Sequence, residues 1–195
     1  MTFKTFMKRC IPLGCAAMLA ASAHANLVTN GGFETGNFTG WNVTLAGSGS
    51  NLSVVNNFPH TGIFYARFGA TSGLPDTISQ SLATVAGASY AIDYWLRNSG
   101  SGPNQFDFNW DGGAVEQSLV NAAPFGYTQF SYSLVATSAL TTISFASSHG
   151  PSFFRLDDVN VEFVSGPIAV PEPTSLALVG LAGLIVFSVR RRRQV

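Results

Sequence analysis

The chain has 195 residues with ten basic and ten acidic side chains, so its formal net charge is zero. Seven of the basic residues lie in the two ends, and between residues 26 and 170 three arginines stand against nine acidic residues, a net charge of −6. A surface that is acidic and free of lysine repels phosphate backbones, which argues against nucleic acid as a partner. The roughly 145 residues of this segment are enough for one domain with its own core.

The N-terminus has the pattern of an export signal. Lys4, Lys8 and Arg9 precede an apolar stretch over residues 10–21, and Ala23-His24-Ala25 supplies small residues at a cleavage point. We therefore predict a signal peptide over residues 1–25. Leu13-Gly14-Cys15 weakly resembles a lipoprotein signal, but cleavage there would leave a very short apolar region. Both cysteines precede residue 26, so the mature domain has no disulfide.

The mature segment contains short runs in which polar and apolar residues alternate between Gly, Asn, Ser and Pro clusters. This pattern predicts an all-β domain over residues 26–164, a sandwich of about nine strands. The predicted strands are residues 52–55, 63–68, 77–85, 89–97, 105–110, 117–120, 127–135, 141–146 and 154–163.

The strand at residues 89–97 has one apolar and one polar face. Successive side chains point to opposite faces, so one face carries Tyr90, Ile92, Tyr94 and Leu96, and the other carries Asp93, Trp95 and Arg97. The first set is predicted core. The second is a candidate sugar site, because an indole stacks on the apolar face of a sugar ring while charged groups bind its hydroxyls. The polar face of the site could extend to Asp107, Asn109, Gln129 and Arg67.

This assignment has an alternative. Trp95 would have a purely structural role if it packed beneath a loop, and we expect Trp41 and Trp110 to lie in the core. The two histidines of the mature segment, His60 and His149, lie in predicted loops and are expected to be solvated.

The C-terminus consists of a rigid turn, an apolar span and a basic cluster. A linker over residues 165–173 ends in Pro171-Glu172-Pro173, and residues 175–189 carry no charge before Arg190, Arg191, Arg192 and Arg193. The pattern predicts a short transmembrane helix within residues 174–195, with the arginines on the cytoplasmic side. A simple permanent anchor would also satisfy the apolar span and arginines.

The Pro-Glu-Pro motif, the small-residue helix and the arginine cluster together resemble the PEP-CTERM sorting tail of exported bacterial proteins. The resemblance implies processing by an exosortase near the motif. The protein would then be tethered to the membrane transiently before reaching the cell surface or extracellular matrix.

Three stretches of the domain resemble the galactose-binding-like and CBM4/9-like jelly-roll carbohydrate-binding modules. They are Asn26-Leu27-Val28-Thr29-Asn30-Gly31-Gly32-Phe33-Glu34-Thr35-Gly36 with Gly40-Trp41, residues 78–87 leading to Tyr90, and residues 154–161. The resemblance implies a jelly-roll fold in which the first and last strands are neighbours.

In those modules a structural calcium ion lies between these strands. Counting back by two from Val159 and Val161 predicts that Asp157 faces the rim of the core, where a carboxylate needs a partner. Glu34 is the expected companion, and two carboxylates with backbone carbonyls suit Ca²⁺. Alternatively, Asp157 and Glu34 simply accept amide hydrogen bonds at turns.

The sequence favours a non-catalytic, exported domain that binds extracellular polysaccharide. A structural matrix protein without a specific glycan site is the second hypothesis. A glycan-active enzyme is the third, because Asp93, Asp107, Asp111 and Glu116 could supply paired carboxylates. The segment has no recognisable nucleophile or metal-binding histidine motif.

Overall fold

A computed structural model describes residues 25–113 and 115–167. Residues 1–24 of the predicted signal peptide, the Pro-Glu-Pro motif, the arginine cluster and the predicted membrane helix lie outside these ranges. Within them, no helix is long and apolar enough to cross a membrane.

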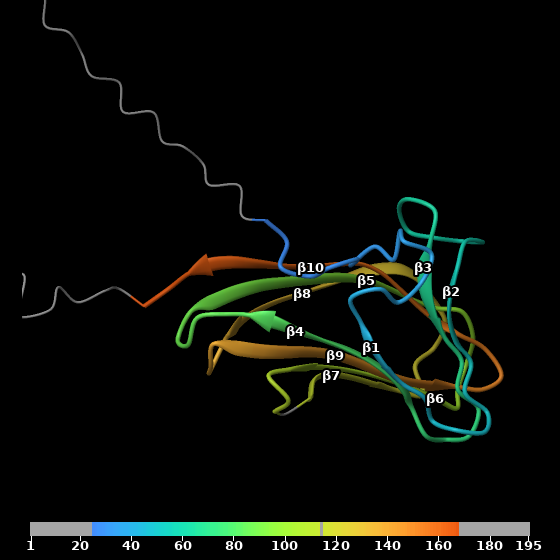
Figure 1. Ribbon diagram of the computed structural model, residues 1–195. Coiled ribbons are helices and arrows are strands. Elements are labelled where there is room, and N and C mark those ends of the chain that lie inside the picture. Colours follow the sequence, from blue (N-terminus) through green and yellow to red (C-terminus); the bar gives the residue numbers. More distant parts are fainter. Residues whose placement is uncertain (1–24, 114, 168–195) are drawn as a thin grey trace, which may run out of the picture.

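Ten strands in the described ranges form two five-stranded antiparallel sheets that pack face to face as a sandwich (Figure 1). The first sheet has the order β1 (Asn42–Thr44), β4 (Asp76–Ala83), β9 (Leu140–His149), β6 (Asn104–Trp110) and β7 (Val115–Val120). The second has the order β2 (Leu52–Val55), β3 (Tyr65–Phe68), β10 (Phe154–Ser165), β5 (Ser89–Asn98) and β8 (Phe125–Val135).

The all-β prediction is confirmed, and each of the nine predicted runs contains a strand. The tenth strand, β1, was missed because its three residues are all exposed and carry no alternation. Ile63 and Phe64 were assigned to a strand but precede β3, since their amides donate to the side chain of Glu34. Strand β9 continues to His149, three residues past its predicted end.

The core is largely aromatic. Tyr90, Ile92, Tyr94 and Leu96 are at most 2% exposed, which confirms the predicted inner face of β5. The ring of Tyr94 packs against that of Phe145 from the opposite sheet, with centroids 5.1 Å apart. Each such buried side chain contributes about 1.5–3 kcal/mol, so a domain without cysteine has a substantial source of stability.

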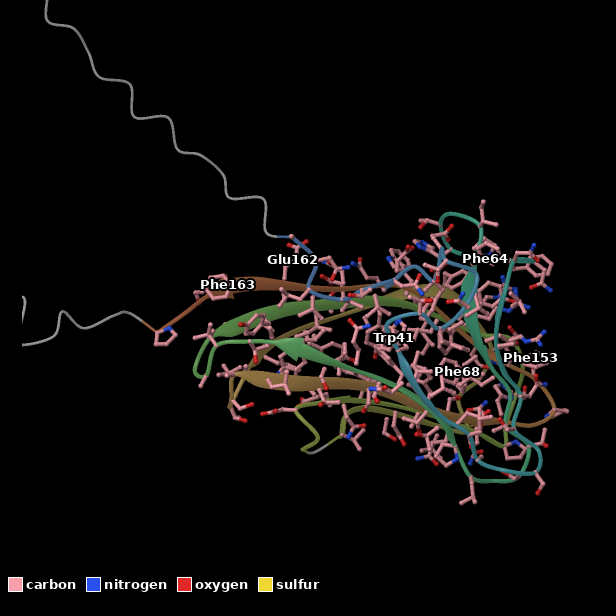
Figure 2. All side chains as sticks on the ribbon, in the orientation of Figure 1. Trp41, Phe64, Phe68, Phe153, Glu162 and Phe163 are labelled. Carbon is pink, nitrogen blue, oxygen red and sulfur yellow. The ribbon has the colours of Figure 1, made fainter. Side chains whose placement is uncertain are left out.

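Trp41 and Trp110 are 7% and 4% exposed, as predicted for core residues. Figure 2 shows Trp41 and Phe68 between the two layers.

The opening segment lies along the last strand. The amide of Leu27 donates to the carbonyl of Val161 at 2.8 Å, and the amide of Val159 donates to that of Gly31 at 3.0 Å. A Cβ atom at Gly31 would lie 2.0 Å from the carbonyl oxygen of Val159, so this approach needs glycine. The neighbourhood of the first and last segments, expected from the resemblance, is therefore present.

The predicted face of Asp157 was wrong. Strand β10 contains a bulge: Asp157 lies opposite Trp95, the next register pair is Asn160 with Asp93, and Asp158 has φ of +48°. The extra residue breaks the period of two, so Leu156 and Val159 both face the core while Asp157 lies on the outer face. Asp157 is nevertheless fully buried, because the loop at residues 57–64 covers it.

Candidate functional site

The predicted ligand residues Asp93, Trp95 and Arg97 share the outer face of β5, and all three are half-buried. Gln129 of β8 lies opposite Trp95, and its amide donates to Asp93 at 3.3 Å. Asp107 and Asn109 do not extend this face, because they lie on β6 in the other sheet. The outer face of β5 and β8 therefore combines an indole with a carboxylate, an amide and a guanidinium.

The indole of Trp95 is covered on one side. The imidazole of His60 lies on it with ring centroids 3.9 Å apart and planes inclined by 16°. The ring of Tyr127 lies 5.2 Å from the same imidazole, and its hydroxyl donates to the carbonyl of Phe58. This is the loop packing considered as the alternative for Trp95, and it leaves less of the indole for a sugar.

Two aspartates of the β10 bulge hold this loop in place. Oδ2 of Asp157 accepts the amides of His60 at 2.7 Å and Thr61 at 3.4 Å. Asp158 contacts Nδ1 of His60 at 2.6 Å and accepts the hydroxyl of Thr61 at 2.6 Å. Burial raises the pKa of the Asp157 carboxyl to about 7, although its bond with the His60 amide opposes the shift.

Glu34 holds the next part of the same loop. Its Oε1 accepts the amides of Ile63 and Phe64, each at 3.0 Å. A Cβ atom at Gly62, where φ is +61°, would lie 2.3 Å from that oxygen. Glu34 and Asp157 thus converge on one loop through its amides, as the alternative to calcium predicted. Within residues 25–113 and 115–167, no three acidic, histidine or cysteine side chains form a group able to hold a metal ion.

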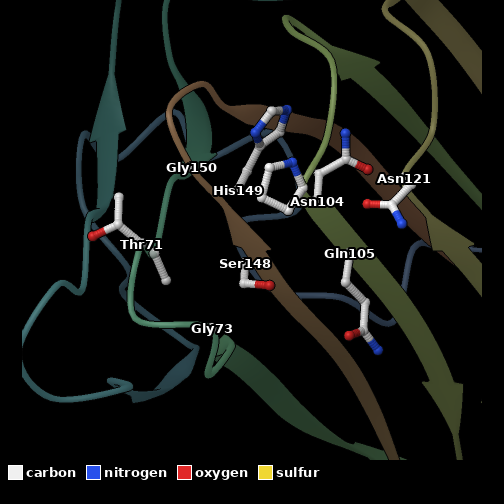
Figure 3. Close-up of a pocket in the computed structure, with 10 residues that line it drawn as sticks. Thr71, Gly73, Asn104, Gln105, Asn121, Ser148, His149 and Gly150 are labelled. Atoms are coloured by element: carbon white, nitrogen blue, oxygen red, sulfur yellow. The ribbon is translucent and has the colours of Figure 1, made fainter.

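A hollow of about 230 Å³ opens near the ends of β6 and β9 (Figure 3). Polar side chains dominate its lining, among them Thr71, Asn104, Gln105, Asn121, Ser148 and His149. Hydroxyl and amide groups in a concave site are suited to the hydroxyls of a sugar.

His149 was expected to be solvated, and this was wrong. It is fully buried at the end of β9, and Nε2 lies 2.8 Å from Oδ1 of Asn98. Burial lowers the pKa of its imidazole, which is therefore neutral at pH 7. The sequence signal was obscured, because the Ser-Ser-His-Gly-Pro string is typical of a turn.

Sequence reasoning also missed the arrangement of the arginines. Arg67 of β3 lies opposite Arg155 of β10, which in turn lies opposite Arg97 of β5. Register between distant strands cannot be read from spacing along the chain. The available signal was that these three are the only basic residues, apart from histidine, between residues 26 and 170.

Comparison with known proteins bears on both the tail and the domain. A family model described as the PEP-CTERM protein-sorting motif matches residues 169–193. No curated protein matches the chain.

Three solved structures illustrate the similarity of the domain. TmCBM61 in complex with beta-1,4-galactotriose is 18% identical, with 72% of this chain and 99% of that chain covered and a TM-score of 0.56. The CBM22-1 xylan-binding domain from Paenibacillus barcinonensis Xyn10C is 18% identical, with coverages of 76% and 100% and a TM-score of 0.53. The K3 cleaved adhesin domain of Lys-gingipain from Porphyromonas gingivalis is 14% identical, with coverages of 69% and 96% and a TM-score of 0.55.

At these identities the likeness establishes the fold alone. The chain carries a PEP-CTERM protein-sorting motif, and the β-sandwich that precedes it has the jelly-roll fold of carbohydrate-binding modules.

Proposed function

We propose that this is an exported, non-catalytic protein whose sandwich binds extracellular polysaccharide at the cell surface or in the matrix. The sorting motif supports export and processing by an exosortase-type enzyme, with the predicted helix as a membrane tether. The fold, shared with modules whose structures contain galactotriose or are described as xylan-binding, supports carbohydrate as the ligand class.

The position of the candidate site relative to the tail carries the proposal. Strand β10 begins near Trp95 and the covering loop and ends at Ser165, where the linker to the sorting motif starts. Asp157 and Ser165 are eight residues apart, which corresponds to about 26 Å along a strand. A domain tethered through this linker would hold the site at about this distance from the start of the linker; β10 is labelled in Figure 1.

Asp93, Trp95 and Arg97 are the proposed ligand contacts. Asp93 would accept sugar hydroxyls, Arg97 would donate to ring or hydroxyl oxygens, and the uncovered part of the indole would contact C–H groups. Because His60 covers one side of Trp95, a structural matrix role is the second candidate.

A glycan-active enzyme is less well supported. Asp93 lies on the outer face of the second sheet, whereas Asp107 and Glu116 belong to strands of the first. Asp93 therefore does not share a cleft with Asp107 or Glu116.

We also propose that Asp157 and Glu34 hold a structural Ca²⁺ ion. An ionised carboxylate has about four acceptor positions, and Asp157 uses three for the amides of His60, Thr61 and Asp158. Asp157 is fully buried, and no arginine lies within ion-pair distance of it in the described chain. The chemistry of these oxygens fits a hard cation, which would stabilise the loop and the bulge together.

Affinity electrophoresis of the full chain through gels that contain different polysaccharides tests the proposed function. Selective retardation by some polysaccharides supports a lectin-like domain, and repetition with a chelator shows whether calcium is needed. Trp95→Ala should weaken the retardation without unfolding the domain. Uniform mobility across a broad panel would favour the structural matrix role.

A further inference from the structure

Three arginines form a line across the outer face of the second sheet. Arg67, Arg155 and Arg97, hereafter the arginine row, are consecutive cross-strand partners on β3, β10 and β5. Neighbouring strands lie about 4.8 Å apart, so the row extends for about 10 Å. Burial raises the pKa of the Tyr65 hydroxyl, and the positive charges of the three arginines oppose this shift.

This arrangement has an electrostatic cost. Like charges directly opposite each other on neighbouring strands destabilise a sheet. Nine acidic residues are available between residues 26 and 170, yet in the described ranges the one contact of ion-pair geometry joins His60 and Asp158. No carboxylate of the described chain forms an ion pair with the arginine row, and the nearest along β10 is Asp157, two residues from Arg155 on the same face.

Two of the three guanidinium groups lie against aromatic rings. Arg67 lies over the ring of Phe153 at 4.6 Å, and Arg155 lies over those of Phe58 at 4.8 Å and Tyr65 at 5.5 Å. An aromatic ring that packs against a guanidinium contacts the flat face of the guanidinium. The N–H groups, which lie in the plane of the guanidinium, do not bond to the ring. Nε of Arg67 and both Nε and Nη1 of Arg155 are buried without a hydrogen-bond partner. Because these nitrogens have almost no accessible surface, a ligand would contact the other N–H groups of the two guanidinium groups.

Acidic residues on the same face limit the direction in which an anionic ligand can lie. Asp93 and Glu162 lie farther along β5 and β10, on the other side of the Trp95–Asp157 pair from the arginine row. They would repel an anionic ligand that followed the strands. A ligand that crosses β3, β10 and β5 along the row avoids them.

We infer that the arginine row binds an anionic polysaccharide through the carboxylate or sulfate groups of its sugars. The inference rests on the proposed carbohydrate-binding function and specifies the ligand class. The guanidinium groups provide N–H donors for carboxylates, the aromatic rings fix the orientation of Arg67 and Arg155, and the bound anion offsets the repulsion within the row. The net charge of −6 disfavours a polymer recognised through charge alone.

The test compares two polymers that share a backbone and differ in charge, together with a sulfated polymer of another backbone. Binding of the full chain to polygalacturonate, to its methyl ester and to dextran sulfate is measured by affinity electrophoresis at low salt. We expect retardation by polygalacturonate and weak or no retardation by the ester, with dextran sulfate showing whether sulfate replaces carboxylate. Arg97→Gln should weaken binding about tenfold, since one charge-assisted contact is lost. The side chain of Arg97 makes no ring contact or hydrogen bond within the described chain, so this change should spare the fold.

Ser81→Asp is the matched control. Ser81 is exposed on β4 of the opposite sheet, and the substitution lowers the net charge by the same amount as Arg97→Gln. If both variants lost polysaccharide binding equally, net charge alone would explain the loss, and the arginine row would be overturned as the binding site. Equal retardation by polygalacturonate and its ester would overturn anion selectivity while leaving the proposed carbohydrate binding intact. Binding to none of a broad panel, neutral polymers included, would contradict the proposed function itself.

Discussion

The imidazole of His60 lies flat on the indole of Trp95, and the residue opposite Trp95, Asp157, accepts the His60 amide. A side chain predicted to bind sugar and one predicted to bind metal therefore support the same loop. The covering loop determines how much of the candidate site is accessible, and changes in its anchors should alter stability and binding together.

Replacement of His60 by Ala should uncover the indole. An aromatic pair contributes about 0.5–1.5 kcal/mol beyond its buried area, so the free energy of unfolding should fall by about 1 kcal/mol. The emission of Trp95 should become more accessible to a soluble quencher, and Trp95→Phe supplies the background from Trp41 and Trp110. If the indole binds sugar, His60→Ala should maintain or increase polysaccharide retardation. A clear decrease with the fold intact would instead show that His60 itself takes part in binding.

Replacement of Asp157 should distinguish the carboxylate's two proposed roles. Asp157→Ala leaves the amides of His60 and Thr61 without their acceptor, and unpaired buried amides cost about 1–3 kcal/mol each. Asp157→Asn keeps one oxygen and should be less destabilising. Both variants should lose any thermal stabilisation by Ca²⁺, measured as the shift in Tm on adding calcium to chelator-treated protein. An unchanged calcium response in both would remove Asp157 from the metal proposal.

The raised pKa of Asp157 predicts a pH dependence of stability in the absence of calcium. The folded state holds this proton up to about pH 7, whereas the unfolded state releases it near pH 4. Its contribution is therefore fully present below pH 4 and declines as pH rises through 7. Bound Ca²⁺ favours the ionised form, so calcium should raise Tm more at pH 8 than at pH 5.

Denaturation curves at both pH values, each with calcium and with chelator, measure this dependence. Asp157→Asn serves as the control, since it has no carboxyl to titrate. A wild-type Tm shift of the same size at both pH values would contradict the link between calcium and this carboxylate.

Local alternation predicted the fold well, and its limits are instructive. Tyr90, Ile92, Tyr94 and Leu96 could be assigned to the core because β5 is a long, regular strand with one polar face. Asp157 was assigned to the wrong face because a single inserted residue, Asp158, reverses the phase of everything before it. A bulge of this kind leaves no alternation signal in one sequence.

The candidate site was predictable in part for a similar reason. Asp93, Trp95 and Arg97 lie on one strand, so their common face follows from a period of two. The contact of His60 with Trp95 and the arginine row depend on loop closure and on register between strands far apart in sequence. Long-range pairing of this kind is decided by the packing of the whole sandwich.

The contact between Gly31 and Val159 gives a test of the opening motif. Gly31→Ala would place a Cβ atom 2.0 Å from the Val159 carbonyl oxygen, and the opening segment would have to move away from β10. Such overpacking costs about 1–3 kcal/mol, which should appear in urea denaturation as a lower midpoint. Gly126→Ala is the matched control, because a Cβ atom there meets nothing within 4 Å. Because Glu34 follows this segment, Gly31→Ala should also loosen the covering loop and increase quenching of Trp95. Equal midpoints for the two variants would show that the opening segment adds little to the stability of the domain.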